Sequence, residues 1–441
     1  MKKKQKVPVR GAEMLKELLL FYVPLGLYSM IMMSSHSVIN SGVSRAPDAE
    51  IGLAAFAVTM TIMNMFASPC FTSRQMVVAL AHDKKSLKIT RNVMVKIAAV
   101  SLLFLSILAF TPIGEFVFVN LFNTPENLMS EVKTAAVLTL SLPFVYSLRS
   151  YSQGIIIVEK KTKYLTYTVL IRISFMVFLA FALPKLGFIS GASIGIIIWT
   201  AGMGLEAIIN YLFSRRVYKN LPDTPNYDSG EEDFTQLKAF NFIWPLLLMS
   251  FIWTLGLPVI NSGLGFTKDP DRSIATFQVA RSYAWIAIAF LEMNMRQVSL
   301  IFGTSEDRIS YLKRFTLGVS IVLASIIAIL ALTPVGNWGL INIIGVTDEL
   351  AQAVKPVLVV LIALPLVLAK SEYYMGLLMK LNNTKALSIG KIISIALAGV
   401  SVIALSILLP QLGAVVGAIG LVLGYSCEML YLKYTYHKMI G

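Results

Sequence analysis

Charged side chains occur inside long apolar runs of this sequence, where lipid would make each of them costly. Seven are basic and four are acidic: Arg74, Arg149, Arg172, Arg281, Arg296, Lys370 and Lys391, and Glu206, Glu292, Glu372 and Glu428. A charge at mid-bilayer costs about 2.5–3.5 kcal/mol on insertion scales, so such residues face a bundle interior or a wet cavity. Because basic groups outnumber acids, the pattern predicts a cationic cavity and an anionic cargo.

Two of these arginines suggest how an anion is held. Arg74-Gln75 recurs in the second half of the chain as Arg296-Gln297. Counting about 1.5 Å per residue from the neighbouring polar loops places both arginines near the membrane midplane. A guanidinium group binds phosphate or carboxylate through two parallel hydrogen bonds, so the pair predicts an anion clamp. In the competing interpretation each arginine caps a helix or pairs with Glu206, Glu372 or Glu428.

Further candidates follow from position in the apolar runs. Cargo-binding candidates are Arg149, Arg281 and the two asparagines of a repeated VINSG sequence, Asn40 and Asn261. Candidates for coupling to an ion are His36, Glu206, Glu292 and Glu372. His36 can change charge near neutral pH, although a structural, hydrogen-bonded histidine is the commoner case. Arg281, Trp285, Glu292 and Arg296 share one face at helical spacing, and Glu292 and Arg296 could neutralise each other at i,i+4.

The composition requires a membrane environment for these residues. Hydrophobic residues make up 56% of the 441 and charged residues 14%, against about 25% charged in soluble domains. This excludes a soluble enzyme, a disordered protein and a fibrous protein. The basic N-terminus precedes an apolar stretch too long for a signal peptide, which predicts an uncleaved first membrane helix. Cys70 and Cys427 fit neither a disulfide framework nor a metal motif, and we expect no metal or cofactor.

About twelve apolar runs are long enough to cross a bilayer, and only helices satisfy their backbone groups in lipid. The expected fold is therefore an all-α polytopic membrane protein. Lys and Arg are concentrated in alternate connections, starting with the N-terminus, so both termini are expected in the cytoplasm. This distribution accounts for most of the net charge of +14 without nucleic-acid binding. We expect a multi-pass protein of the plasma (cytoplasmic) membrane, the inner membrane of a bacterium. The runs are near 15–42, 51–81, 93–119, 132–158, 163–183, 189–214, 239–263, 274–303, 315–339, 351–379, 384–409 and 412–435.

The second half of the chain repeats the first. VINSG recurs at an offset of 221, Arg74-Gln75, Thr111-Pro112 and Pro143 recur at 222, and the PxLGxxxGA motif starting at Pro184 recurs at 226. Six spans per half make the repeats parallel, as two pseudo-twofold-related six-helix lobes. The expected division is residues 1–219, an acidic cytoplasmic linker at 220–236, and residues 237–441. Duplicated lobes of this kind favour a transporter that works by alternating access, and we expect a monomer.

The repeated PxLGxxxGA motif and the six-plus-six arrangement resemble the multidrug/oligosaccharidyl-lipid/polysaccharide (MOP) exporter superfamily. Phe21–Gly26, Phe242–Leu246, Asn40-Ser41-Gly42, Arg296-Gln297-Val298 and the sequence IIGV at 343–346 resemble the progressive ankylosis protein family. The resemblance implies the fold of multidrug and toxin extrusion (MATE) transporters, with two lobes enclosing a central cavity. It also implies export of pyrophosphate, nucleotides or citrate, with Arg74 and Arg296 as the basic residues of the second and eighth spans.

The sequence therefore favours a secondary exporter of small organic or phosphate-bearing anions, coupled to H⁺ or Na⁺. A flippase for a lipid-linked oligosaccharide is the first alternative, since it also needs a basic cavity. A cation-coupled multidrug antiporter is the second, although the first span lacks the aspartate that the superfamily's multidrug members carry. An integral-membrane enzyme is not expected, because the chain has no HExxH, P-loop or nucleophile-elbow motif.

Overall fold

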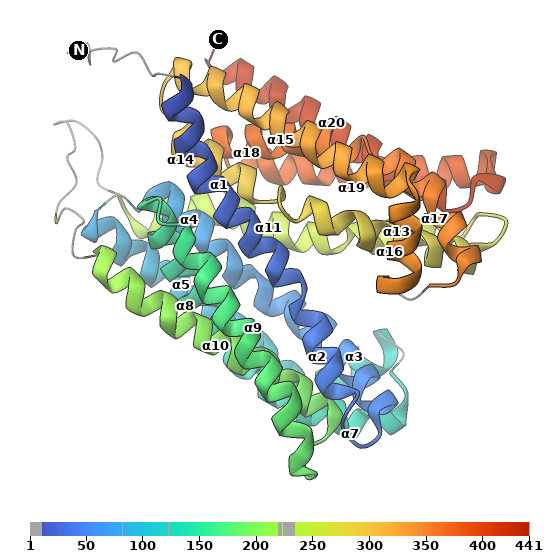
Figure 1. Cartoon of the computed structure of the whole chain (residues 1–441). Coiled ribbons are helices and arrows are strands. Elements are labelled where there is room, and N and C mark those ends of the chain that lie inside the picture. The colour runs from blue at the N-terminus through green and yellow to red at the C-terminus, as the bar shows by residue number, and fades with distance from the viewer. Residues whose placement is uncertain are drawn as a thin grey trace, which may run out of the picture. The chain divides into compact units, whose positions relative to one another are not determined.

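The computed structural model describes residues 11–81, 83–121, 124–218, 223, 234–344 and 346–440. Most of the expected linker, residues 220–222 and 224–233, lies outside the described residues. All regular secondary structure in the described part of the chain is helical, which confirms the all-α prediction. Figure 1 shows these helices joined by short connections.

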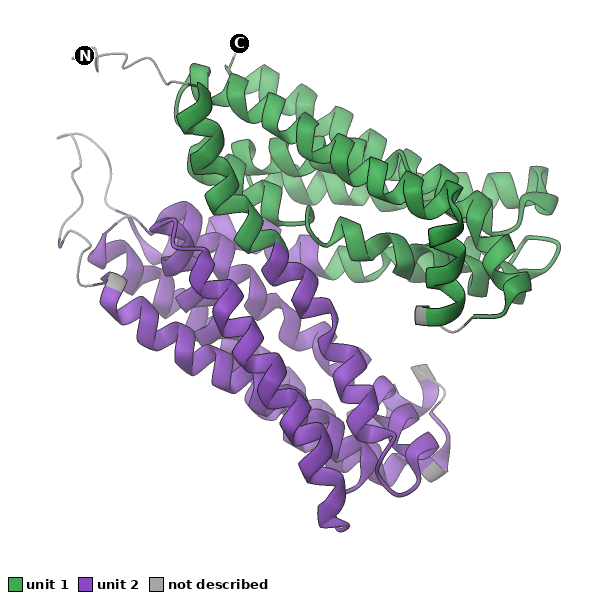
Figure 2. Cartoon of the chain, in the orientation of Figure 1, with its two compact units in different colours: residues 1–26, 251–441 green, residues 27–250 purple. Residues whose placement is uncertain are grey.

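The helices divide by contact into two compact units, which Figure 2 colours separately. Unit 1 comprises residues 1–26 and 251–441, and unit 2 comprises residues 27–250. Two helices contribute to both units, namely α1 (Gly11–Met33) and α11 (Gln236–Thr254).

Unit 2 holds the helices of the first half of the chain, apart from the start of α1. In chain order they are α2 (Ser35–Val43), α3 (Ala49–Ala67), η1 (Ser68–Thr72), α4 (Ser73–Leu80), α5 (Lys84–Phe110), α6 (Pro112–Phe116), η2 (Val117–Leu121), α7 (Glu126–Leu138), η3 (Thr139–Ser141), α8 (Leu142–Val158), α9 (Lys163–Ala182), η4 (Leu183–Leu186) and α10 (Gly191–Tyr218). Within it, α10 packs on α8, α9 and α3.

Unit 1 holds the helices of the second half that follow α11, whose residues 236–250 belong to unit 2. In chain order they are α12 (Gly256–Leu264), α13 (Pro270–Ile288), α14 (Asn294–Phe302), α15 (Glu306–Leu332), α16 (Pro334–Gly339), η5 (Leu340–Ile344), α17 (Asp348–Leu361), α18 (Leu364–Lys380), α19 (Lys385–Leu408), η6 (Pro410–Leu412) and α20 (Ala414–Ile440). Here α20 packs on α19 and α18, and α14 packs on α18.

The internal repeat extends to the helix boundaries. In the register that aligns Arg74 with Arg296, α5 and α15 begin at matching positions and also end at matching positions. The same register aligns both ends of α8 with those of α18. Thr111-Pro112 and Thr333-Pro334 end one helix of each unit and start the next, because a proline at the first helical position loses no hydrogen bond. Local sequence thus sets the same order of helices in both halves.

Ten helices are long and apolar enough to cross a membrane, or eleven if the bent pair α17 and α18 forms one span, counting described residues. The protein is therefore a multi-pass membrane protein. The expected run at 274–303 is not among these candidate spans. It forms two separate helices, α13 and α14. Its charged residues and the break in its middle are the physical reasons, and they mark this run as an interior element.

The break between α13 and α14 spans Ala289–Met293. Met293, the residue directly before α14, has a left-handed φ of 60°, which a regular right-handed helix does not contain. The side-chain amide of Asn294 donates to the carbonyls of Ala289 at 3.2 Å and Phe290 at 3.1 Å. A broken helix within a membrane is stable only when its freed backbone groups find such partners.

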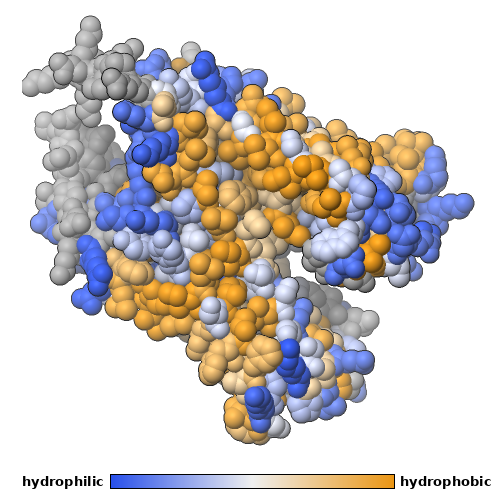
Figure 3. All heavy atoms as spheres, viewed as in Figure 1, coloured by the Kyte–Doolittle hydropathy of each residue, from blue (hydrophilic) through white to orange (hydrophobic). Residues whose placement is uncertain are grey.

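The surface of each unit fits a lipid solvent. Large apolar side chains are exposed along the spanning helices, as at Leu103 (60%) on α5 and Val322 (60%) on α15. Figure 3 shows apolar surface over the flanks of the helices and polar surface gathered toward their ends. Contiguous exposed apolar surface of this extent would aggregate in water, whereas it matches the hydrocarbon of a bilayer.

Candidate functional site

A buried charge cluster in unit 2 is centred on Glu206 of α10. Its Oε2 lies 3.0 Å from Nε of Arg149 on α8 and 2.9 Å from Nη1 of Arg172 on α9. The side chains of Glu206 and Arg172 are 0% exposed, and that of Arg149 is 4% exposed. One carboxylate thus faces two guanidinium groups, and the three side chains together carry an excess positive charge.

Polar side chains complete the shell around this carboxylate. Tyr28 of α1 donates its hydroxyl to Oε1 of Glu206 at 3.3 Å, and Gln153 of α8 donates to the same oxygen at 2.9 Å. Arg149 donates in turn to the Tyr28 hydroxyl. Both carboxylate oxygens therefore have partners, as a buried charge requires. We call Tyr28, Arg149, Gln153, Arg172 and Glu206 the Glu206 cluster.

The Glu206 cluster lies deep within unit 2. Arg149, Arg172 and Glu206 each lie near the middle of a helix within a candidate membrane span. Arg172 also donates to the hydroxyl of Ser35, at the start of α2, at 2.6 Å. Pairing with Glu206 was one of the alternatives that the sequence left open for the arginines of the apolar runs, and the structure shows it for Arg149 and Arg172. Tyr28 and Gln153 were missed, since neither carries a charge.

In unit 1, Arg296 forms a bidentate ion pair with Glu372 of α18. Arg296 Nε lies 2.9 Å from Oε2 and Nη2 lies 2.8 Å from Oε1. Both side chains are almost fully buried, at 3% and 4% exposure. This pairing corresponds to the alternative to an anion clamp, in which the arginine pairs with a buried glutamate. An anion that binds at Arg296 would therefore have to compete with Glu372.

A second buried ion pair in unit 1 joins Lys391 of α19 to Glu428 of α20, with Nζ 2.8 Å from Oε2. The lysine also lies 4.6 Å from the centre of the Tyr425 ring. Glu428 aligns with Glu206 in the register that aligns Arg296 with Arg74, and both glutamates are 0% exposed. The repeat therefore places one buried acid at the same position of each unit. This equivalence could have been found in the sequence by extending the register to the two glutamates.

Of the stripe expected on the run at 274–303, Arg281, Trp285 and Glu292 form a chain of contacts, whereas Arg296 does not join it. Trp285 donates its indole N–H to Glu292 at 3.0 Å, and Arg281 lies 4.6 Å from the centre of the Trp285 ring. The i,i+4 pair of Glu292 and Arg296, which the sequence left open as an alternative, does not form. The regular helix is interrupted at Ala289–Met293, and Arg296 turns to Glu372 instead.

Arg74 and Arg296 lie near the starts of equivalent helices, α4 and α14. A Cβ added to Gly154 of α8 would lie 3.2 Å from the carbonyl oxygen of Arg74. A Cβ added to Gly376 of α18 would lie 2.4 Å from that of Arg296. The two glycines occupy the same position of the repeat. In each unit a glycine therefore lets the helix carrying the arginine approach its neighbour closely.

The polar candidates have separate surroundings. His36 of α2 stacks on Trp199 of α10, with ring centroids 5.2 Å apart. The side-chain carbonyl of Asn261 accepts from Gln278 at 3.4 Å, while Asn40 is exposed. Among the described residues, no group of three His, Cys, Asp or Glu side chains is arranged to hold a metal ion. The contacts thus bring Arg149 and Glu206 together in unit 2, and Arg296 and Glu372 in unit 1.

The fold is that of MOP-superfamily transporters. A mutant of the Vibrio cholerae MATE transporter VcmN matches with a TM-score of 0.75 and 13% identity over 98% of each chain. The eukaryotic MATE transporter AtDTX14 matches with 0.75 and 12% over 96% of each chain. A MOP-superfamily transporter from Pyrococcus furiosus, described as having a binding pocket of reverse polarity, matches with 0.72 and 14% over 96% of this chain and 98% of its own.

A family model narrows this assignment. The model described as progressive ankylosis protein (ANKH) matches residues 8–280 of the 441, which is more than half of the chain. The matched region includes the whole Glu206 cluster, Arg74 and the first part of α13. The chain has the MATE-like fold of the MOP superfamily and belongs to the progressive ankylosis protein (ANKH) family.

Proposed function

We propose that this protein is a secondary active transporter that exports small anions by alternating access, of the pyrophosphate, nucleotide or citrate type. The family assignment and the fold support transport. The anionic cargo is supported by one observation above the others, which is the Glu206 cluster, where one buried carboxylate is shared by two buried guanidinium groups.

The charges that interrupt the spans are distributed unevenly between the units. In unit 1 the acids nearly balance the bases. The acids are Glu292, Glu372 and Glu428, and the bases are Arg281, Arg296, Lys391 and the exposed Lys370. Of the eleven charges singled out in the apolar runs, unit 2 holds Glu206, Arg74, Arg149 and Arg172, and the buried ones are Glu206 and two arginines, Arg149 and Arg172. A buried excess of positive charge is stabilised when an anion enters. Cargo binding on the unit 2 side would supply that missing negative charge.

Glu206 is positioned to couple the binding of H⁺ or Na⁺ to the binding of the cargo. The carboxylate is already paired with both guanidinium groups, so an anionic cargo must either share these arginines with Glu206 or displace its carboxylate. The Nε of Arg172 has no hydrogen-bond partner among the described residues, which leaves a donor available for an anion oxygen. Protonation of Glu206, or Na⁺ bound to it, would free the arginines for the cargo. Occupancy of one carboxylate by H⁺ or Na⁺ would then change the affinity for the anion.

The proposal can be tested in proteoliposomes loaded separately with labelled pyrophosphate, ATP and citrate, and with a cationic dye. We expect efflux of at least one anion and no efflux of the dye. Arg149→Gln should lower anion efflux about tenfold or more, because a hydrogen-bonded charge is lost from the site. Arg272→Gln is the matched control, since Arg272 also pairs with a glutamate, Glu349, but is 52% exposed. Its efflux should equal that of the wild type.

Three outcomes would contradict the proposal. Efflux of the dye without efflux of any anion would indicate a multidrug antiporter. Movement of a lipid-linked sugar phosphate between leaflets, with no efflux of soluble anions, would indicate a flippase. Equal anion efflux by Arg149→Gln and the wild type would show that the Glu206 cluster is not part of the cargo pathway.

A further inference from the structure

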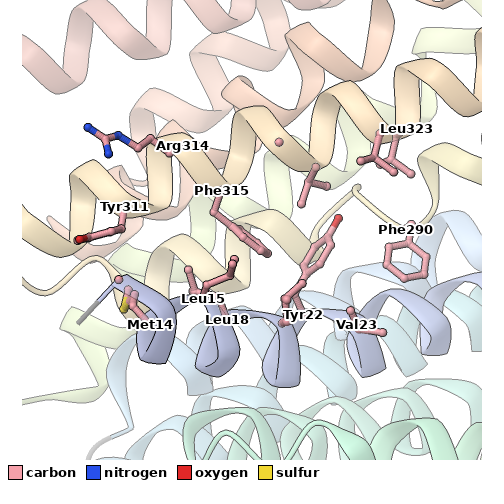
Figure 4. Close-up of a pocket in the computed structure, with 15 residues that line it drawn as sticks. Met14, Leu15, Leu18, Tyr22, Val23, Phe290, Tyr311, Arg314, Phe315 and Leu323 are labelled. Atoms are coloured by element: carbon pink, nitrogen blue, oxygen red, sulfur yellow. The ribbon is translucent and has the colours of Figure 1, made fainter. Parts of the chain in front are cut away.

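An apolar groove in unit 1 lies between the start of α1 and the first half of α15. Its volume is about 570 Å³. Met14, Leu18 and Tyr22 of α1 form one wall, and Phe315, Val319 and Val322 of α15 form the other. Figure 4 shows Phe290 and Leu323 at one end and Tyr311 and Arg314 at the opposite end, with Tyr22 and Phe315 between them.

The groove opens toward the bilayer. Both of its walls belong to helices long and apolar enough to cross a membrane. Leu15 and Val322, which line it, are 49% and 60% exposed. Gly318 also lines it, and a Cβ added there would meet nothing within 4 Å. A missing side chain on α15 therefore keeps the groove open on a surface that otherwise faces hydrocarbon.

The length of the groove matches one leaflet. From Tyr311 to Leu323 the helix advances by about 18 Å, at roughly 1.5 Å per residue. Half of a bilayer's hydrocarbon core is about 15 Å thick. An acyl chain that lies along α15 would therefore fill the groove from one end to the other.

One end of the groove is polar. Arg314 is the only charged residue among those that line it, and its side chain is exposed and forms no ion pair within the described part of the chain. Tyr311 adds a hydroxyl beside Gly11, where α1 begins. The sequence before Gly11 also includes five basic residues: Lys2, Lys3, Lys4, Lys6 and Arg10. Basic sequence next to a span attracts anionic lipids.

We propose that this groove binds an anionic phospholipid from the leaflet on the side of the N-terminus. One acyl chain lies between α1 and α15, and the phosphate lies at Arg314 with the Tyr311 hydroxyl as a second donor. An apolar channel with a single arginine at its headgroup end is complementary to such a lipid. The site is separate from the Glu206 cluster, which belongs to unit 2.

Native mass spectrometry of the full-length protein in a mild detergent can test the site with phosphatidylglycerol and phosphatidylcholine of identical acyl chains. Gly318→Phe fills the groove and should weaken binding of the first lipid of either kind about tenfold, because its apolar contacts are lost. Arg314→Gln should weaken phosphatidylglycerol binding about fivefold and leave phosphatidylcholine unchanged.

Matched controls separate the site from general effects. Lys313→Gln removes the same charge from the neighbouring residue, which does not line the groove. Gly204→Phe adds the same bulk at a glycine of α10 that also has open space around it. Both should bind lipid as the wild type does. The smaller Gly318→Leu replaces Gly318→Phe if the latter unfolds, as judged by thermal unfolding and gel filtration.

Three results would overturn the proposal. The first is unchanged lipid binding by both Gly318 variants. The second is an equal effect of Arg314→Gln and Lys313→Gln on phosphatidylglycerol. The third is a dimer in the wild type that Gly318→Phe converts to a monomer with its bound lipid unchanged, which would assign the groove to a second copy of the chain.

Discussion

Replacing Glu206 by glutamine tests the cluster at its centre. The glutamine keeps the shape and an oxygen that can accept from Tyr28 and Gln153, so the change removes little except the charge. Two ion pairs, of 3.0 Å and 2.9 Å, are lost together. At an effective dielectric constant of about 20, each pair is worth about 5 kcal/mol of Coulomb energy before compensation. Measured losses for breaking a buried pair are about 3–5 kcal/mol.

We therefore expect Glu206→Gln to lower the free energy of unfolding by about 3–5 kcal/mol. For a unit of this size, that corresponds to a drop in Tm on the order of 10 °C. Thermal unfolding of the purified protein, followed by gel filtration of heated samples, measures it. Glu349→Gln is the control, because its carboxylate pairs with Arg272 at the surface and is 77% exposed. Equal Tm values for Glu206→Gln and Glu349→Gln would show that the buried ion pairs of Glu206 do not stabilise the fold.

Other predictions concern the unit 1 pair, the helix packing and the topology. Arg296→Met or Glu372→Leu alone should cost about 3–5 kcal/mol, and the double variant should recover most of the loss, because no uncompensated charge stays buried; additive losses in thermal unfolding would contradict the pairing. Gly376→Ala should destabilise the protein by about 1–3 kcal/mol, since its methyl group meets the α14 backbone, whereas Gly204→Ala should be neutral or stabilising. A cysteine added at either terminus should react with an impermeant maleimide in inside-out vesicles and be protected in right-side-out vesicles. Opposite results for the two termini would exclude an even number of spans.

The helical architecture could be predicted because lipid leaves the backbone few choices. Apolar runs of sufficient length must be helices, and the register of the repeat aligns the boundaries of α5 with those of α15. The run at 274–303 was the exception. Its break depends on the left-handed backbone at Met293 and on the bonds of Asn294, which a hydrophobicity pattern cannot reveal.

The charges and the acids that could pair with them could be found in the sequence, but which pairs form could not. Arg149, Arg172 and Glu206 come from three helices, and only the packing of α8, α9 and α10 brings them together. The register of the internal repeat, however, already aligns Glu206 with Glu428. By contrast, nothing local distinguishes a guanidinium group that pairs with Glu372 from one that is available to a cargo.

Equilibrium binding to the purified protein tests the anionic cargo most directly. Labelled pyrophosphate and citrate, and a lipophilic cation as the counterpart, would be titrated against the wild type and a variant with Arg149 and Arg172 both changed to glutamine. We expect saturable binding of an anion that is lost in this variant, and no saturable binding of the cation. Saturable binding of the cation, with no anion bound by the wild type, would contradict this expectation.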